Sequence, residues 1–548
     1  TLTINVWVNI LPGVTQQPVA QTRCEDDTVS FHMTAIGDFI TLQWYHDNNI
    51  IPGATSNSYS ISKIALADAG QYFCRVTSQS CGYFDTDIIN LTVVQKFVVN
   101  SVTENVTCYG AGDASIDLTL AGATPPVNYL WNTGATTEDL SSLQPGYYTV
   151  FIRMGGLGND MVTGIKTDLN GNTYVTGRFQ ATANFQTQTL TSFGDDDIFL
   201  AKYNTAGNLS WIKQAGGTLK DQGRDLSLDS LGNIYVTGIF TQMAFFEATM
   251  VNAVGNADAF IAKYDNNGNL QWVKSMGGFF DDAANGVHSD NEGYTWVAGS
   301  FQGISTFGSE TLISAGGDDA FVSKFSPSGN IQWTKPAGGT SEDFANDVVV
   351  DISDDAIITG RFQGTASFGT SNLVTTGNND AFVAKYGPTG NLKWTRKAGG
   401  TGNDLGRSIA VDQSQNIYTT GSFEGNASFG VNSAVSNGLK DAFVAKYDKD
   451  GNSQWVRGIG GTMVDNAKSI EVDALGNSFI AGTFRNTMQL GDKTLTAAGQ
   501  NDMFMAKYST TGYLVWSQQV GGTGADSAMV IALRPDKNLL VGGSFSNS

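Results

Sequence analysis

Cysteine and histidine are scarce in this sequence. Of its 548 residues, 4 are cysteine and 3 are histidine. The histidines are His32, His46 and His288, and no Cys-x-x-Cys pair exists, so a zinc site of ordinary composition is not expected. The cysteines all lie within the first 108 residues, at Cys24, Cys74, Cys81 and Cys108. This distribution is typical of structural disulfides in small extracellular modules that precede a larger domain without them.

Long apolar runs and positive charges are also scarce. No stretch approaches the roughly 20 apolar residues that cross a bilayer, so we expect no transmembrane segment. The chain carries 31 Lys and Arg against 51 Asp and Glu, a formal net charge of −20. A surface that binds phosphate backbones needs clustered Lys and Arg, so nucleic acid is not an expected partner.

The first residues do not resemble a targeting segment. Thr1–Asn9 alternates in polarity like a strand and lacks the pattern of a signal peptide. We therefore interpret residues 1–10 as the last strand of a preceding domain, in a chain that starts inside a longer protein.

The composition and a long repeat predict an all-β fold. Glycine is abundant, at 65 residues, and the apolar residues are rich in Val, Ile, Phe, Tyr and Trp, which favour strands. Trp recurs at intervals of 61 residues, at positions 211, 272, 333, 394, 455 and 516. A Gly-x-Phe pair recurs seven times with the same spacing, from Gly177 to Gly543. Each unit therefore occupies an equivalent place in a regular array.

One 61-residue unit, residues 399–459, holds four β-rich runs separated by turn residues, which is typical of a propeller blade. A solenoid is the competing architecture, but its repeats are shorter. Seven copies of the first half-unit and six of the second predict a seven-bladed β-propeller over residues 154–548, with the last blade incomplete. Either residues 146–153 supply the outer strand that closes the ring, or the natural chain continues past Ser548.

Two smaller β-sandwich modules are expected before the propeller. Residues 11–97 contain Trp44-Tyr45 and, in Tyr72-Phe-Cys74, a Tyr two residues before a Cys. That is a tyrosine-corner pattern, and the module resembles the immunoglobulin family. Cys24 precedes Trp44 by 20 residues, whereas the usual partner strand would place its core residue near Met33. The pairing of the four cysteines stays open, because four cysteines allow three connectivities.

Residues 98–153 contain Pro125-Pro126, Tyr129-Leu-Trp131 and Pro145-Gly-Tyr-Tyr148. Through these elements the segment resembles the short β-repeat of the SprB gliding adhesin. That family has a second Cys after Cys108, which is absent here.

The 61-residue units resemble the seven-bladed β-propeller repeat family of secreted bacterial proteins. The resemblance rests on Asp168–Gly177, its near-copy Asp229–Gly238, and the repeated Asp-Ala-Phe-Val-Ala-Lys-Tyr of 380–386 and 441–447. Together the three resemblances imply an extracellular, cell-surface protein of the Bacteroidota, exported by the type IX secretion system. They imply a role in adhesion or gliding, with outer-membrane secretion or adhesin-carrying machinery as partners.

Repeated residues are poor candidates for catalysis, since a catalytic site is asymmetric. Asp recurs in two phases, at 168 to 473 and at 160 to 526, and we expect these carboxylates to cap turns. Asp265 and the pair Asp448 and Asp450 resemble the start of a calcium loop, but Met276 and Ile459 stand where the Glu at its twelfth position belongs. The equivalent segments of the other units have in common a Gly, which a tight hairpin requires.

Function in a propeller is expected where the repeats differ. One column on the first strand of each unit consists of small residues interrupted by Lys166, His288 and Glu471. Either Lys166, His288 and Glu471 line a ligand-binding surface, or they are tolerated polar substitutions. No nucleophile set and no phosphate loop stands out, so we expect no enzyme and no cofactor.

The leading hypothesis is an adhesin or scaffold that binds a glycan or a surface protein through the propeller. The rival is a propeller-type glycan hydrolase or lyase that uses paired carboxylates in the channel. A third hypothesis is an export cargo or spacer without a ligand of its own.

Overall fold

The computed structural model describes residues 11–24, 28–79, 82–94, 98–104, 114–121, 130–131, 140–143, 150–151, 155–156, 158–186, 188–205 and 207–545. These residues are mostly β-strand, with one short 3-10 turn, η1 (Leu66–Asp68). The chain divides into an N-terminal unit and a propeller unit, which are described separately.

The N-terminal unit begins with a module of short sheets, which are antiparallel except for the parallel pair of β2 and β10. Its strands are β1 (Gly13–Gln16), β2 (Gln21–Cys24), β3 (Val29–His32), β4 (Thr34–Ile36), β5 (Ile40–His46), β6 (Asn49–Ile50), β7 (Ser58–Ile61), β8 (Gly70–Ser78), β9 (Gly82–Asp85) and β10 (Ile89–Val94). The largest sheet has the order β2-β10-β8-β5-β6 with β9 beside β8, and two-stranded sheets pair β3 with β7 and β1 with β4.

The core of this module is aromatic. Phe31 packs against Tyr72, with ring centroids 4.9 Å apart, and both lie beside the fully buried Trp44. The Tyr72 hydroxyl donates a hydrogen bond of 2.7 Å to the Asp68 carbonyl oxygen. This is the tyrosine-corner geometry that the sequence motif predicts, and it supports the immunoglobulin-like interpretation.

The sequence predicts disulfides, but the one cysteine side chain that the structure describes is not part of one. Cys74 is a free, fully buried thiol in the aromatic core, and burial raises its pKa to about 11. Phe31 and Met33 form the opposite face of the core, so apolar contacts take the place of the disulfide that is usual there. Cys81, Cys108 and the side chain of Cys24 lie outside the described residues.

Residues 98–153 are described in part. Strands β11 (Val98–Glu104), β12 (Ala114–Ala121) and β14 (Leu140–Leu143) form one sheet. Strand β13 (Leu130–Trp131) pairs with β15 (Val150–Phe151). The described part of the suggested ring-closing strand therefore pairs locally, and its flanks, 146–149 and 152–153, lie outside the described residues.

In its described part the propeller contains six four-stranded blades and a final two-stranded pair, and strand pairing joins the first four blades into one continuous sheet. After a short strand β16 (Gly155–Gly156), the blades comprise β17 (Met161–Thr167), β18 (Thr173–Phe185), β19 (Gln188–Tyr203) and β20 (Leu209–Gly216); β21 (Gln222–Leu228), β22 (Ile234–Phe246), β23 (Thr249–Tyr264) and β24 (Leu270–Gly278); β25 (Ala283–Ser289), β26 (Thr295–Phe307), β27 (Glu310–Phe325) and β28 (Ile331–Gly339); β29 (Phe344–Val350), β30 (Ala356–Phe368), β31 (Ser371–Tyr386) and β32 (Leu392–Gly400); β33 (Leu405–Val411), β34 (Ile417–Phe423), β37 (Asp441–Tyr447) and β38 (Ser453–Ile459); β39 (Asn466–Val472), β40 (Ser478–Phe484), β43 (Asp502–Tyr508) and β44 (Leu514–Val520); then β45 (Asp526–Leu533) and β46 (Leu539–Phe545).

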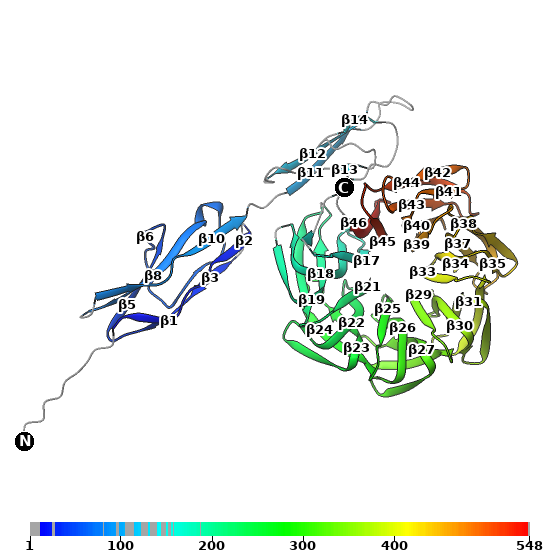
Figure 1. The fold of residues 1–548 in the computed structure, drawn as a ribbon, viewed down its shortest axis with the longest axis horizontal. Helices are drawn as coiled ribbons and strands as arrows, with labels where there is room; N and C mark the ends of the chain where they lie inside the picture. The colour runs from blue at the N-terminus through cyan, green and yellow to red at the C-terminus, as the bar shows by residue number, and fades with distance from the viewer. Residues whose placement is uncertain are drawn as a thin grey trace, which may run out of the picture. The chain divides into compact units, whose positions relative to one another are not determined.

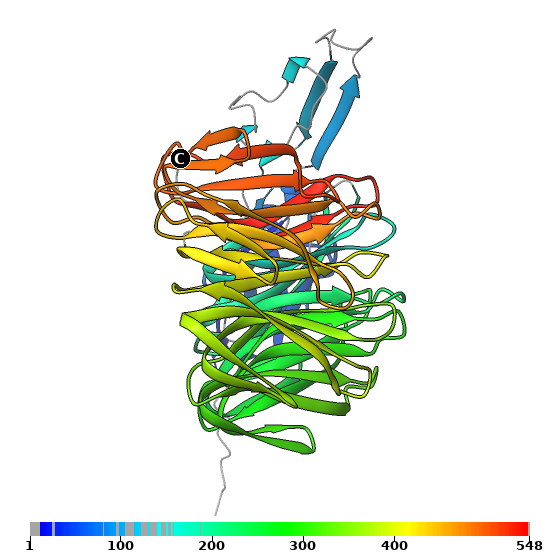
Figure 2. The same cartoon turned by 90° about the vertical axis from the view of Figure 1, so that its right-hand side faces the viewer.

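The blades close into a ring. The innermost strands β17, β21, β25, β29, β33, β39 and β45 each contact the next, and β45 contacts β17 (Figure 1). The Thr167 hydroxyl donates to the Leu533 carbonyl oxygen at 2.9 Å across this closure. Figure 2 shows the ring from the side. The architecture is the seven-bladed, all-β propeller predicted from the 61-residue repeat.

The second to sixth blades also reach back to the blade before them. In the fifth blade the extra hairpin is separate, as β35 (Asn426–Phe429) and β36 (Asn432–Val435), and the sixth has β41 (Thr487–Leu490) and β42 (Lys493–Thr496). Gly399 and Gly400 at the end of β32 pair with Ser428 and Ala427 of β35. Neighbouring blades are thus joined by backbone hydrogen bonds as well as by side-chain packing.

The repeated glycines mark places where two backbones touch. A Cβ at Gly238 of the Gly-x-Phe pair would lie 1.9 Å from the Gln222 carbonyl oxygen, and the six equivalent glycines face the same obstacle at 1.8–2.0 Å. In the Gly-Gly pair, a Cβ at Gly400 would lie 1.8 Å from the Asn426 carbonyl oxygen. The repeat therefore preserves contact geometry that no larger residue permits.

The repeated tryptophans join neighbouring blades. The Trp272 indole donates to the Pro327 carbonyl oxygen at 3.1 Å, and Trp333 donates to Pro388 at 2.8 Å. Trp211, Trp394 and Trp455 make the same bond to the residue 55 positions ahead. This bond explains why the indole recurs at one place in the unit.

The repeated carboxylates meet in pairs at the blade junctions. Asp221 accepts hydrogen bonds from the backbone N–H groups of Gly217 and Thr241, at 2.7 and 2.9 Å. Asp197 approaches the same point, since a Cβ at Gly216 would lie 2.8 Å from the Asp197 carboxyl and 3.1 Å from that of Asp221. Among the described residues, one buried oxygen of Asp197 has no hydrogen-bond partner, and its equivalents in five other blades share this feature. A protonated carboxyl suits such a site better than a bare anion.

These pairs predict that the propeller is more stable at mildly acidic pH. Burial, reinforced by the neighbouring carboxylate, raises the pKa of Asp221 and Asp343 to about 7 and that of Asp404 to about 6, from 3.8. The folded state therefore binds more protons than the unfolded chain between pH 4 and 7, so stability is present at low pH and is lost as pH rises through 6–7. We expect the melting temperature to rise by about 5 °C between pH 8 and pH 6, measured by calorimetry.

Asp221→Asn should reduce this pH dependence without abolishing it, because the amide carries no titrating proton at that junction while the other junctions still titrate. A melting temperature that falls from pH 8 to pH 6 would contradict the interpretation that these buried carboxyls are protonated in the folded state.

Candidate functional site

The centre of the ring holds a cavity of about 1140 Å³. All seven innermost strands contribute to its wall, so residues that differ between blades meet around one space. We call this space the channel. It is the candidate functional site, since a propeller concentrates its asymmetric side chains there.

Lys166, His288 and Glu471, the residues predicted to face a ligand, all line the channel. Lys166 and Glu471 bind each other, with Lys166 Nζ 2.7 Å from Glu471 Oε1. They come from β17 and β39, and the blade between them contributes only the small Ala532 at this position. Burial disfavours the charged lysine, but Glu471 and Asp225 outweigh it and raise the pKa of Lys166. Two of the three predicted residues are therefore each other's partners.

His288 is close enough to Lys166 to be affected by its charge. Loss of solvation and the positive charge of Lys166 lower the pKa of His288 to about 4, so its imidazole is neutral at pH 7. It contributes a hydrogen-bonding group to the wall and no charge.

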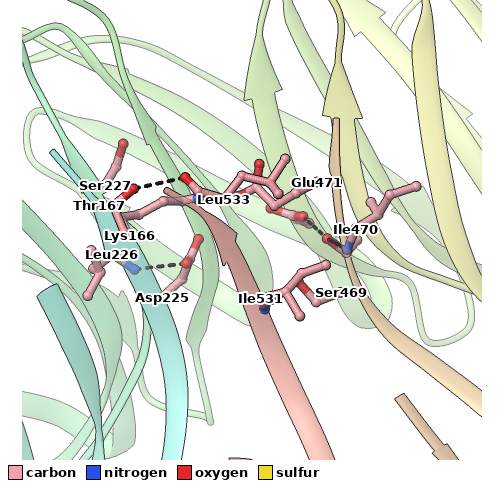
Figure 3. A network of polar contacts seen from close by, with 12 residues as sticks. Lys166, Thr167, Asp225, Leu226, Ser227, Ser469, Ile470, Glu471, Ile531 and Leu533 are labelled. Atoms are coloured by element: carbon pink, nitrogen blue, oxygen red, sulfur yellow. Dashed lines mark hydrogen bonds and ion pairs between the residues drawn. The ribbon is translucent and has the colours of Figure 1, made fainter. Parts of the chain in front are cut away.

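Two further carboxylates, Asp225 and Asp347, line the channel. Figure 3 shows Lys166, Asp225 and Glu471 on three different strands of the ring. Asp225 accepts a 2.9 Å hydrogen bond from the Val287 backbone N–H, and Asp347 accepts one of 2.9 Å from Ile409. Burial raises the pKa of Asp225 to about 7 and that of Asp347 to about 6. Both carboxylates thus join one blade to the next.

Each innermost strand carries a β-bulge, which adds one unpaired residue. The seven bulge residues all line the channel, and they are Thr163, Arg224, Asn285, Asn346, Arg407, Lys468 and Met529. We call them the bulge ring. Part of it is structural, because Thr163 and Asn346 donate to backbone oxygens of the next blade, Gly223 and Gly406, at 2.7 Å each.

The cations of the bulge ring have no carboxylate partner among the described residues. Arg224 donates to the side-chain oxygen of Asn285. Loss of solvation and the charge of Arg407 lower the pKa of Arg224 to about 10 and that of Lys468 to about 8. Loss of solvation and the charge of Arg361 lower the pKa of Arg407 as well. The three charges therefore repel one another in a confined space of an acidic protein.

The sequence interpretation missed the bulge ring. Its members recur at 61-residue spacing like the column of Lys166, three positions earlier in each unit, so comparison of that column between units would have found them. The column of the bulge ring faces the channel only because each innermost strand has its β-bulge at that position.

The calcium candidates are turn residues. Asp265 accepts hydrogen bonds from the backbone N–H groups of Asn267 and Asn269, both at 2.9 Å, and Asp448 bonds Asp450 and Asn452 in the same way. The Asp450 side chain is exposed beside Lys449. The described part of the chain holds no group of three His, Cys, Asp or Glu arranged for a metal.

Two family models match this chain. Residues 210–238 and 393–422 match the beta-propeller repeat, and residues 100–136 match the SprB repeat. Two segments of the ring thus match the beta-propeller repeat.

Two curated proteins are similar to this chain at low identity. The uncharacterized WD repeat-containing protein L264 of Acanthamoeba polyphaga mimivirus is 23% identical over 437 residues, covering 63% of this chain and 32% of that protein. The regulatory protein FlaEY of Caulobacter vibrioides is 27% identical over 357 residues, covering 60% of this chain and 36% of that protein. The chain thus spans about a third of the length of either relative.

Among solved structures, titin domain M7 is 21% identical and covers 16% of this chain and 98% of its own, with a TM-score of 0.15. In the described part of the chain, no helix is long and apolar enough to cross a membrane.

Proposed function

We propose that this chain belongs to an extracellular, cell-surface-associated adhesin or scaffold that binds a glycan or a surface protein through its propeller. The observation that carries the proposal is the channel, a cavity of about 1140 Å³ in which the non-repeated side chains of seven blades meet. Cavities of this size accommodate ligands larger than a single sugar ring.

The N-terminal modules and the repeat matches support the surface role. Residues 100–136 match the SprB repeat, and the immunoglobulin-like module precedes them as a spacer. We propose accordingly that the protein is cargo of the type IX secretion system, works with adhesin-carrying machinery at the outer membrane, and contributes to gliding motility.

A second candidate is a glycan hydrolase or lyase. It is favoured by the raised pKa values of Asp225 and Asp347, because a carboxyl that stays protonated near neutral pH can act as a general acid. The hydrogen bonds that hold both carboxylates to the next blade favour a structural role instead.

The test is an array of bacterial and plant glycans probed with the purified chain, together with a reducing-end assay on every glycan that binds. Retention without new reducing ends or unsaturated products supports the adhesin. Release of products by the unsubstituted chain, and its loss in Asp225→Asn, would establish that the chain cleaves glycans. Failure to bind any glycan or surface protein extract would overturn the binding proposal.

A further inference from the structure

The bulge ring has the charge and geometry of an anion site. Arg407 and Lys468 lie at the same position of the neighbouring strands β33 and β39, and Arg224 lies at that position on β21. All three line the channel, and none of them is among the ion pairs of the described residues. An unpaired cation in a confined space destabilises the fold, so its presence is explained best by a ligand that neutralises it.

Several of the other charges of the channel wall already have partners. Arg178 binds Asp196 at 2.8 Å, and Arg361 lies 3.4 Å from Glu342. Lys166 binds Glu471, while Asp225 and Asp347 accept backbone hydrogen bonds. The three cations of the bulge ring, by contrast, have no carboxylate partner among the described residues and remain open to an incoming group.

We propose that the bulge ring binds the carboxylate or sulfate group of an acidic saccharide, through Arg407, Lys468 and Arg224. This inference rests on the proposed binding function and names its ligand class. A guanidinium presents a planar fork of donors that matches a carboxylate or sulfate, and the adjacent ammonium adds a second charged donor.

The chemistry of the chain limits the ligand to a small anion. The net charge of −20 repels a long polyanion, whereas one or two acidic groups can enter a channel whose own wall is positive at this level. Thr163 and Asn346 stand on the same ring, and although each donates to a backbone oxygen, their side-chain oxygens can accept hydrogen bonds from sugar hydroxyls.

Isothermal titration calorimetry on the whole chain tests the proposal with three probes: a galacturonic acid trimer, the same trimer with its carboxyls reduced to alcohols, and inorganic sulfate. We expect the acidic trimer to bind at least tenfold more tightly than the reduced trimer, with an affinity that falls as sodium chloride is raised. The double variant R407Q/K468Q should lose at least tenfold in affinity for the acidic trimer. Lys493→Gln, on the exposed hairpin strand β42, should leave it unchanged.

The melting temperature separates a ligand-binding role from a structural one. Since Arg407 and Lys468 repel each other, R407Q/K468Q should melt at or above the temperature of the unsubstituted chain while binding is lost. Equal binding of both trimers, or unchanged affinity in R407Q/K468Q, would overturn the anion site and leave the wider binding function standing. Sulfate binding that depends on Arg407 and Lys468, without trimer binding, would uphold the anion site and overturn its saccharide ligand.

Discussion

Gly238→Ala should destabilise the propeller by at least about 3 kcal/mol, because the new methyl group has no space between two paired strands. Gly238 on β22 pairs with Gly223 on β21, and the added Cβ would lie 1.9 Å from the Gln222 carbonyl oxygen. Backbone cannot rotate away as a flexible side chain can, so the innermost hairpin must open. The measurement is the midpoint of urea unfolding, followed by tryptophan fluorescence.

Gly491→Ala is the matched control. Its φ of +60° also disfavours alanine, but a Cβ there meets nothing within 4 Å, so we expect a loss of only about 1 kcal/mol. Gly421→Ala, at the position equivalent to Gly238 in another blade, should match the large effect. A midpoint shift for Gly238→Ala no larger than that for Gly491→Ala would show that the hairpin absorbs the methyl group.

This clash also explains why so much of the fold was predictable from the sequence. Where every blade makes the same backbone contact, every blade needs the same residue, and a column such as Gly177 to Gly543 stands out without any structure. The tryptophan bonds between blades and the turn-capping carboxylates act in the same way. Strand number and ring size followed from those columns.

The candidate site was predictable only in part, because it is made where the repeat breaks. Comparing columns found Lys166, His288 and Glu471, but spacing carries no information on distances across a ring. Lys166 and Glu471 reach each other because the residue at the same position of the blade between them, Ala532, has only a methyl group as its side chain. The bulge ring was missed because a β-bulge interrupts the two-residue alternation that tells inward from outward residues.

The cysteine expectation was wrong at Cys74 for a related reason. The Tyr72-Phe-Cys74 motif gave the tyrosine corner correctly, since that bond is local and joins residues four apart. A disulfide depends on a second strand, and in this core that strand presents Phe31 and Met33. Local motifs therefore predicted local geometry, while the partner across the core required the structure.

Lys385→Met should destabilise the propeller by about 3–5 kcal/mol, because it leaves the buried carboxylate of Asp351 without its ion-pair partner. Asp355 keeps a second lysine, Lys393, at 2.6 Å. Lys385 Nζ lies 2.7 Å from Asp351 and 3.3 Å from Asp355, and all three side chains are at most 5% exposed. The fourth blade has Ile357 where other blades place an aromatic ring beneath the lysine, so here the ammonium binds carboxylates instead. The measurement is again the midpoint of urea unfolding.

Lys446→Met is the matched control, from the same position of the next blade. Lys446 Nζ lies 4.9 Å from the centre of the Tyr418 ring and is partly exposed, so its loss should reduce stability by only about 1 kcal/mol. Adding Asp351→Asn to Lys385→Met removes the uncompensated charge and should recover a large part of the lost stability. If the double variant is no more stable than Lys385→Met alone, the lysine contributes through packing of its aliphatic stem rather than through its charge.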